Sequence, residues 1–124
     1  MRYFIDTNCC IYLLAGTHPA LTLRISETAA GDIGLSTIVL AEFALGLQRG
    51  AGLPDQRLEL LKEQMPVQAF DQAAAEAYAR LPFRRGRFDR LLAAHAVSRG
   101  LTLITNNPRD FADIPDLAVE NWTL

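Results

Sequence analysis

The chain has 124 residues, half of them hydrophobic, and its formal net charge is −2 at pH 7. This length suits one domain over residues 1–124, and the hydrophobic content excludes a disordered chain. The slightly negative charge excludes binding to nucleic acid by bulk electrostatics, so contact with an anion requires a local basic patch or a metal ion.

The apolar residues recur with strand and helix spacing in alternation. Asp6, Ser36 or Thr37, and Asp71 can cap the helices that follow them, while Gly31 can end one. In chain order we predict a strand at 2–5, a helix at 9–14, a helix at 20–30, a strand at 33–36, a helix at 37–50, a helix at 54–65, a strand at 67–70, a helix at 71–81, a helix at 87–100, a strand at 101–105 and a strand at 117–122.

This order of elements predicts a parallel sheet with helices on both faces. In open sheets of this kind, ligands bind beyond the carboxyl ends of the strands. Several polar residues fall at such ends, namely Asp6, Ser36, Asp71 and 105–107. The sequence therefore points to this edge of the sheet as the place for a functional site.

The two cysteines, Cys9 and Cys10, are adjacent. Neighbouring cysteines rarely form a disulfide, so we expect both to pack in a helix of a reduced, cytoplasmic protein. Asp6 interrupts the first apolar stretch, so we expect no signal peptide. No apolar run reaches the roughly 18 residues of a membrane span, so we expect no membrane partner either.

Glu42 is the one charged residue in the segment STIVLAEFALGL. Ile38 and Val39 lie one helical turn before it and Leu45 one turn after, which places it on an apolar stripe. Burying a lone carboxylate costs several kcal/mol against a total stability of roughly 5–15 kcal/mol. Two explanations stay open: a structural carboxylate, paired with a buried arginine or exposed at the helix end, and a functional one.

Asp89 lies in the first turn of a predicted helix, where the helix dipole stabilises a carboxylate by about 0.3–1 kcal/mol. That effect alone can explain the residue. The apolar helix that follows and the short loop before it, with Gly86, also aim Asp89 at the sheet. Asn106 and Asn107 follow a strand, and asparagine is a common turn residue whose side-chain oxygen can also bind a hard cation.

If Asp6, Glu42 and Asp89 converge at the strand ends, their mutual repulsion requires relief. Grouped carboxylates suit Mg²⁺ or Mn²⁺, which prefer oxygen ligands and keep several waters. Such ions activate water, polarise a phosphate and stabilise a leaving oxygen. The predicted chemistry is therefore hydrolysis of a phosphodiester bond.

Four segments together resemble the PIN domain of the VapC toxin family: FIDTN, STIVLAEFALG, GRFDRLLAAHA and LTLITNNPRDF…VENW. The resemblance spans nearly the whole chain in the right order. It implies a three-layer α/β sandwich with a central parallel sheet of four to five strands flanked by helices. It also implies a Mg²⁺- or Mn²⁺-dependent endoribonuclease, the toxin of a type II toxin–antitoxin system, that forms a homodimer and binds a VapB-like antitoxin.

The resemblance assigns roles to four residues. Asp6, Glu42 and Asp89 match the family's first three acidic residues, and Asn107 falls at the fourth. It implies that Asp6 and Asp89 bind the metal, that Glu42 binds it through water or orients the attacking water, and that Asn107 supports them. RNA is then cleaved to leave a 5′-phosphate. Because Asn107 is neutral, one or two ions remain open, and Asp110 lies near enough in sequence to compensate.

Other polar residues receive more modest interpretations. His95 is expected to be a satisfied core or surface histidine, and His18 to lie in a loop without a partner. A basic stretch beside Asp89 suits contact with RNA phosphates, and a solvated face explains it equally well. Its members are Arg80, Arg84, Arg85, Arg87 and Arg90.

Three alternatives remain. A catalytically inactive PIN-type module that binds RNA or a partner is supported by Asn107 at the fourth position. A haloacid-dehalogenase-like phosphatase would carry a second Asp two residues after Asp6, where this chain has Asn8. A receiver-like domain would need a lysine after a late strand, which the segment LITNN does not offer.

Overall fold

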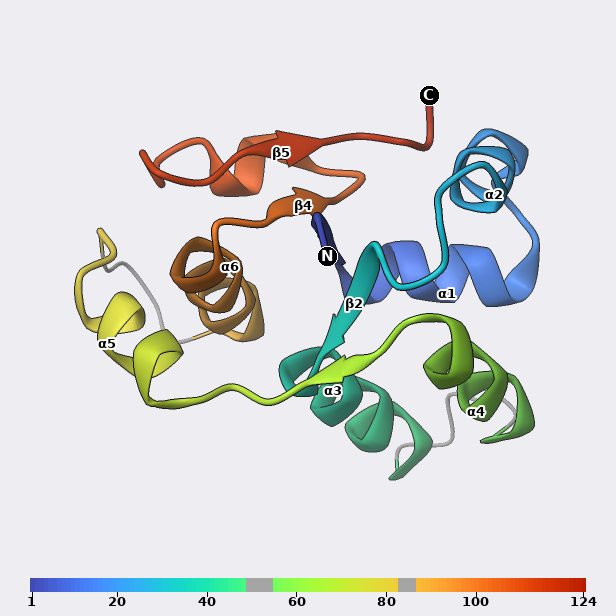
Figure 1. Cartoon of the computed structure of the whole chain (residues 1–124), viewed down its shortest axis with the longest axis horizontal. Coiled ribbons are helices and arrows are strands. Elements are labelled where there is room, and N and C mark those ends of the chain that lie inside the picture. The colour runs from blue at the N-terminus through green and yellow to red at the C-terminus, as the bar shows by residue number, and fades with distance from the viewer. Residues whose placement is uncertain (49–54, 83–86) are drawn as a thin grey trace.

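The computed structural model describes residues 1–48, 55–82 and 87–124. Over these residues five parallel strands form one sheet in the order β3-β2-β1-β4-β5 (Figure 1). The predicted central parallel sheet is thus confirmed, with five strands. The strands are β1 (Tyr3–Ile5), β2 (Ile33–Ser36), β3 (Val67–Gln68), β4 (Thr102–Ile104) and β5 (Val119–Glu120).

Helices cover both faces of the sheet, which gives the expected three layers. The first two helices and α4 lie on one side, and α5 and α6 lie on the other (Figure 1), while α3 contacts both α1 and α6. None of the helices in the described ranges is long and apolar enough to cross a membrane. The helices are α1 (Thr7–Ala15), α2 (Pro19–Ser26), α3 (Thr37–Gln48), α4 (Asp55–Gln64), α5 (Gln72–Ala79), α6 (Phe88–Arg99) and the 3₁₀ helix η1 (Pro108–Phe111).

The predicted caps begin the helices. Asp6 accepts a hydrogen bond from the Cys9 N–H at 2.8 Å, and Asp71 accepts one from the Ala74 N–H at 3.0 Å. Ser36 Oγ accepts one from the Ile38 N–H at 3.1 Å at the start of α3. Each bond satisfies a backbone donor that has no partner within its helix.

Three elements are clearly shorter than predicted. α2 ends at Ser26 rather than near Gly31, where the hydroxyls of Ser26 and Thr28 bind the carbonyls of Leu23 and Arg24. Strands β3 and β5 are also shorter, because they lie at the two edges of the sheet and each pairs with one strand. Four residues expected to end or begin helices lie outside the described residues, namely Arg49, Gly50, Pro54 and Gly86.

His95 lies in the core of the protein, with no exposed surface. Its ring packs against those of Phe4 and Phe70, with centroids 4.6 and 5.6 Å away, and its Nδ1 lies 2.8 Å from Ser36 Oγ. Burial, aided by Arg99 and opposed by Asp71, lowers the pKa of His95 to about 4. The expectation of a satisfied core histidine is met at Nδ1, while Nε2 makes no well-formed hydrogen bond within the described residues, although hydrogen bonding to the Ala69 backbone opposes the lowering of the His95 pKa.

His18 does have partners, contrary to expectation. Its ring stacks on that of Tyr12 with 3.9 Å between centroids. Its Nδ1 lies 2.8 Å from Thr17 Oγ1. The loop before α2 therefore folds back onto α1, a contact that sequence spacing does not reveal. The cysteines fulfil the prediction, because Cys9 and Cys10 are both free and buried in α1.

Acid should destabilise the protein through His95. The folded pKa of about 4 lies below the ordinary 6.5, so the unfolded chain binds a proton that the folded chain does not. The resulting loss is about 3 kcal/mol as the pH falls from 6.5 to 4. Urea unfolding at several pH values should show a flatter acid dependence for His95→Asn than for the wild type. Parallel curves would contradict the assignment.

Candidate active site

Three acidic side chains lie within reach of one another's charge at the carboxyl edge of the sheet. Asp6 directly follows β1, Glu42 lies in α3, and Asp89 lies in the first turn of α6. Glu42 is close enough to both other carboxylates for their charges to raise its pKa, and Asp6 acts on Asp89 in the same way. The strands β1 and β2 are adjacent and parallel, so the segments that leave them start at one edge.

Asp6 is fixed on two sides. Its backbone N–H donates to the Ile104 carbonyl of β4 at 3.0 Å, while its carboxylate caps α1 through Cys9. Its charge raises the pKa of the buried Cys9 thiol further, beyond the larger effect of burial. Both cysteines therefore stay protonated, which supports the prediction that they pack rather than act as nucleophiles.

Glu42 is half-buried, and the Thr7 hydroxyl donates a hydrogen bond to its Oε1 at 2.7 Å. Burial raises the pKa of Glu42, the Thr7 bond lowers it, and Asp89 and Asp6 raise it again. No arginine or lysine in the described ranges pairs with Glu42. The structural explanation by a buried ion pair therefore receives no support.

The expected apolar stripe on α3 is only partly correct. Val39 and Phe43 are buried, but Leu45 is 39% exposed. Glu42 thus borders the buried face, and its carboxylate turns toward the start of α1, where Thr7 binds it.

Asp89 is also half-buried, and its environment mixes both signs of charge. Burial is the largest cause of its raised pKa, followed by the charges of Asp110 and Asp6, while Arg87 and Arg90 lower it. The guanidinium of Arg90 is held by Asp113 at 3.0 Å. Of the expected basic stretch, Arg84 and Arg85 lie outside the described residues.

The fourth position differs from expectation. Asn107 is exposed, and its side chain makes no hydrogen bond to the described residues, although its backbone N–H binds Thr105 Oγ1 at 3.1 Å. Asp110 instead is the neighbouring acid with the largest effect on Asp89. The turn of η1 brings it back, because the Asp110 N–H binds the Asn107 carbonyl at 3.2 Å. The sequence signal for Asp110 was its position three residues after Asn107, near enough to compensate.

The side chains do not by themselves enclose an ion. Within the described ranges, no group of three histidine, cysteine, aspartate or glutamate side chains is gathered closely enough to hold a metal. The carboxylates of Asp6, Glu42 and Asp89 interact through their charges rather than through shared contacts. An ion at this edge would therefore keep part of its water shell.

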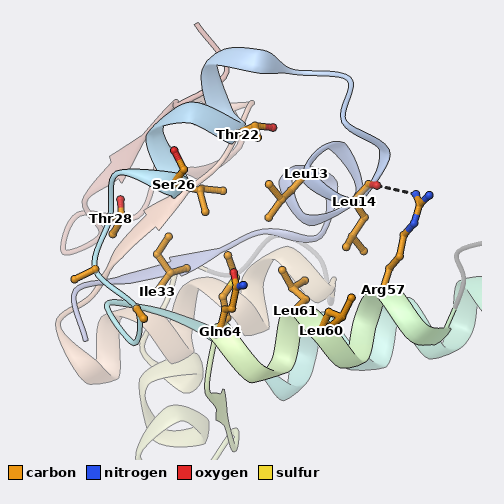
Figure 2. Close-up of a pocket in the computed structure, with 14 residues that line it drawn as sticks. Leu13, Leu14, Thr22, Ser26, Thr28, Ile33, Arg57, Leu60, Leu61 and Gln64 are labelled. Carbon is orange, nitrogen blue, oxygen red and sulfur yellow. Dashed lines mark hydrogen bonds between the residues drawn. The ribbon is translucent and has the colours of Figure 1, made fainter.

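A separate apolar groove of about 540 Å³ lies between α1, α2 and α4 (Figure 2). Leu13 and Leu14 line it from α1, and Leu60 and Leu61 from α4. At its rim the Arg57 guanidinium donates to the Leu14 carbonyl at 2.8 Å. The groove shares α1 with the acidic edge, since Asp6 lies about 12 Å along the helix from Leu14.

The pKa of Glu42 tests this geometry, because two substitutions should shift it in opposite directions. Thr7→Val should raise it, because the hydroxyl bond that favours the carboxylate is lost, and Asp89→Asn should lower it, because a like charge is removed. Carbon-13 NMR titration of Glu42 in metal-free protein measures both. An unchanged pKa in Asp89→Asn would show that the two carboxylates are not neighbours.

Comparison with known proteins identifies the family. A sequence model of the PIN domain matches residues 3–117. Ribonuclease VapC2 of Rickettsia felis is 31% identical to this chain, with 98% of each protein covered. The tRNA(fMet)-specific endonuclease VapC of Shigella flexneri is 29% identical, with 99% of each covered.

Solved structures agree with this assignment. A chain in the crystal structure of VapBC2 from Rickettsia felis bound to a promoter DNA fragment matches with a TM-score of 0.84 and 28% identity, over 98% of this chain and 99% of that one. VapBC-1 from nontypeable Haemophilus influenzae matches with a TM-score of 0.80 and 29% identity over all of both chains. This chain therefore belongs to the PIN domain family and, within it, to the VapC ribonucleases of toxin–antitoxin systems.

Proposed function

We propose that this protein is a single-domain, metal-dependent endoribonuclease whose catalytic site contains Asp6, Glu42 and Asp89. One observation carries the proposal: at one edge of the sheet the charges of Asp89 and Asp6 raise the pKa of Glu42, that of Asp6 raises the pKa of Asp89, and no described cation pairs with Glu42. A divalent cation would relieve this repulsion. The substrate to test first is initiator transfer RNA, because the Shigella flexneri relative is named for it.

The donor set suits Mg²⁺ or Mn²⁺. Oxygen ligands fit these ions, and Mg²⁺ commonly binds through one or two carboxylates while it keeps several waters. Asp6 and Asp89 would hold the ion, and Glu42 would bind it through water. When bound, such an ion supplies an activated water and neutralises charge on the phosphate.

The residues of this chain have separable roles. The Cys9 N–H holds the Asp6 carboxylate in place, and the Thr7 hydroxyl holds Glu42, which can orient the attacking water. Arg87 is exposed beside Asp89 and can contact an RNA phosphate. Cleavage with a 5′-phosphate product, as the resemblance implies, remains part of the proposal.

The fourth role is assigned to Asn107, with Asp110 as its rival. Asn107 was proposed from the family pattern, whereas the charge that reaches Asp89 comes from Asp110. The inactive, partner-binding module rests on Asn107 alone. Asp110 weakens that alternative, because its carboxylate lies near Asp89 and could take the role for which Asn107 has no charge.

The apolar groove is the proposed site for a VapB-like antitoxin. Leu60 is 61% exposed within it, and a protein partner that covers the groove would remove this leucine from water. Similar solved structures are VapBC complexes. The groove reaches the acidic edge through α1, so a segment bound there can extend toward Asp6. The proposal also includes a cytoplasmic homodimer, as the resemblance implies.

Catalysis should depend on the acids and on the ion. With Mn²⁺ or Mg²⁺, purified antitoxin-free protein should cleave RNA, and Asp6→Asn, Glu42→Gln or Asp89→Asn should lower the rate by about 100-fold or more. EDTA should abolish cleavage. Glu27→Gln, at the exposed end of α2, is the matched control and should cleave normally.

The same assay ranks the two candidates for the fourth role. Loss of activity in Asn107→Ala with normal Asp110→Asn supports the family pattern, and the reverse supports Asp110. Folded, metal-loaded protein that cleaves neither total RNA nor initiator transfer RNA would favour the inactive module.

Antitoxin binding should depend on the groove. Leu60→Glu places a charge on its apolar wall and should weaken binding at least about tenfold, or ~1.4 kcal/mol. Leu23→Glu is the matched control, because Leu23 is 60% exposed on α2 outside the groove. Titration calorimetry with the cognate antitoxin measures both variants. Equal affinities for the two would place the antitoxin elsewhere.

A further inference from the structure

Ser36 and His95 form a buried polar pair that the proposed reaction does not use. Both side chains have no exposed surface, and Ser36 Oγ lies 2.8 Å from His95 Nδ1. Ser36 is the last residue of β2, and His95 lies in α6. The pair therefore joins segments 59 residues apart in the sequence.

Each member of the pair is tied to a helix that carries a proposed catalytic carboxylate: Ser36 directly precedes α3, and His95 lies in α6. Ser36 Oγ also accepts from the Ile38 N–H at 3.1 Å, which fixes the first turn of α3, the helix of Glu42. His95 lies six residues, or about 9 Å, along α6 from Asp89. The serine hydroxyl thus stands between the two helices, and α3 and α6 are in contact.

The hydrogen-bonding capacity of the two groups indicates why a histidine lies here. Ser36 Oγ accepts from Ile38, so its own hydroxyl proton is free to donate to the Nδ1 of a neutral His95. The backbone of Ala69 also interacts with the imidazole by hydrogen bonding, although Nε2 makes no well-formed hydrogen bond within the described residues. The bond of Nδ1 with Ser36 is the contact that links the imidazole to the residue before α3.

We infer that the Ser36–His95 hydrogen bond is a positioning device that sets the separation of α3 and α6, and thereby that of Glu42 and Asp89. The other polar contact of Glu42, with Thr7, ties it to α1 and not to α6. Among the described residues, Ser36–His95 is the one side-chain hydrogen bond between the start of α3 and α6. Its catalytic consequence rests on the proposed function, while its structural consequence does not.

The test compares four variants. Ser36→Ala and His95→Leu remove the bond, whereas His95→Asn retains an amide group at the place of Nδ1. Ser98→Ala is the matched control: it is also a serine-to-alanine change, but Ser98 Oγ binds only the His95 carbonyl within α6, at 2.8 Å. Three quantities are measured: the amide NMR signals of Glu42 and Asp89 without metal, the dissociation constant for Mn²⁺, and kcat and KM for RNA.

Loss of the bond should shift the amide signals of both Glu42 and Asp89 and weaken Mn²⁺ binding several-fold. It should lower kcat by about 10- to 100-fold with KM unchanged, because the carboxylates are misplaced while RNA contacts persist. Combining Ser36→Ala with His95→Leu should add little to either change alone. His95→Asn should restore part of the loss, and Ser98→Ala should resemble the wild type.

The inference is overturned if folded Ser36→Ala has the amide signals, the Mn²⁺ affinity and the kcat of the wild type. It is also overturned if Ser98→Ala changes these quantities as much as Ser36→Ala does. If Ser36→Ala does not fold, the comparison of His95→Asn with His95→Leu decides, and equal defects in these two overturn it. A wild type that cleaves no RNA rejects the proposed function. The NMR signals and the Mn²⁺ affinity then still decide whether the bond positions the two carboxylates.

Discussion

Repulsion between carboxylates at one edge of a parallel sheet is the constraint on which the rest of this site depends. Asp6, Glu42 and Asp89 come from three separate elements, and the fold holds them within reach of one another's charge. Like charges held together in a partly buried place raise the free energy of the folded state. A ligand of opposite charge would compensate for this cost, and the divalent cation of the proposed reaction is such a ligand.

Neutral donors, rather than ion pairs, hold the first two acids. A backbone N–H binds Asp6 and a threonine hydroxyl binds Glu42. Each carboxylate is therefore oriented by a neutral donor, without an arginine that would neutralise its charge. Of the three acids, Asp89 is the one whose pKa the described arginines lower, and Arg90 is already engaged by Asp113. Within the described part of the chain, Asp6 and Glu42 therefore keep carboxylates that no ion pair neutralises. The Ser36–His95 bond, itself neutral, adds a link between the two helices without changing that charge.

The sequence predicted the fold well because it follows from local rules, and the role of the three acids stays a prediction. Apolar periodicity predicts the strands, and Asp6, Ser36 and Asp71 mark the helix starts by capping. The resemblance of four segments then predicted the family. What failed depends on three-dimensional packing that residue spacing does not show, such as the stacking of His18 on Tyr12 or the short edge strand β3. The position of Asp110 near Asp89 depends on the 3₁₀ helix η1. The sequence predicts a turn there but not its helical form.

The central claim is that these carboxylates form a site for a divalent cation. Anomalous diffraction from crystals of the antitoxin-free protein soaked in Mn²⁺ tests it most directly. The account predicts an anomalous peak at the carboxyl edge of the sheet, in contact with Asp6 or Asp89 and with ordered waters around it, and no such peak in Asp6→Asn crystals. A wild-type edge without a peak at saturating Mn²⁺, or an ion bound only elsewhere on the protein, would contradict it.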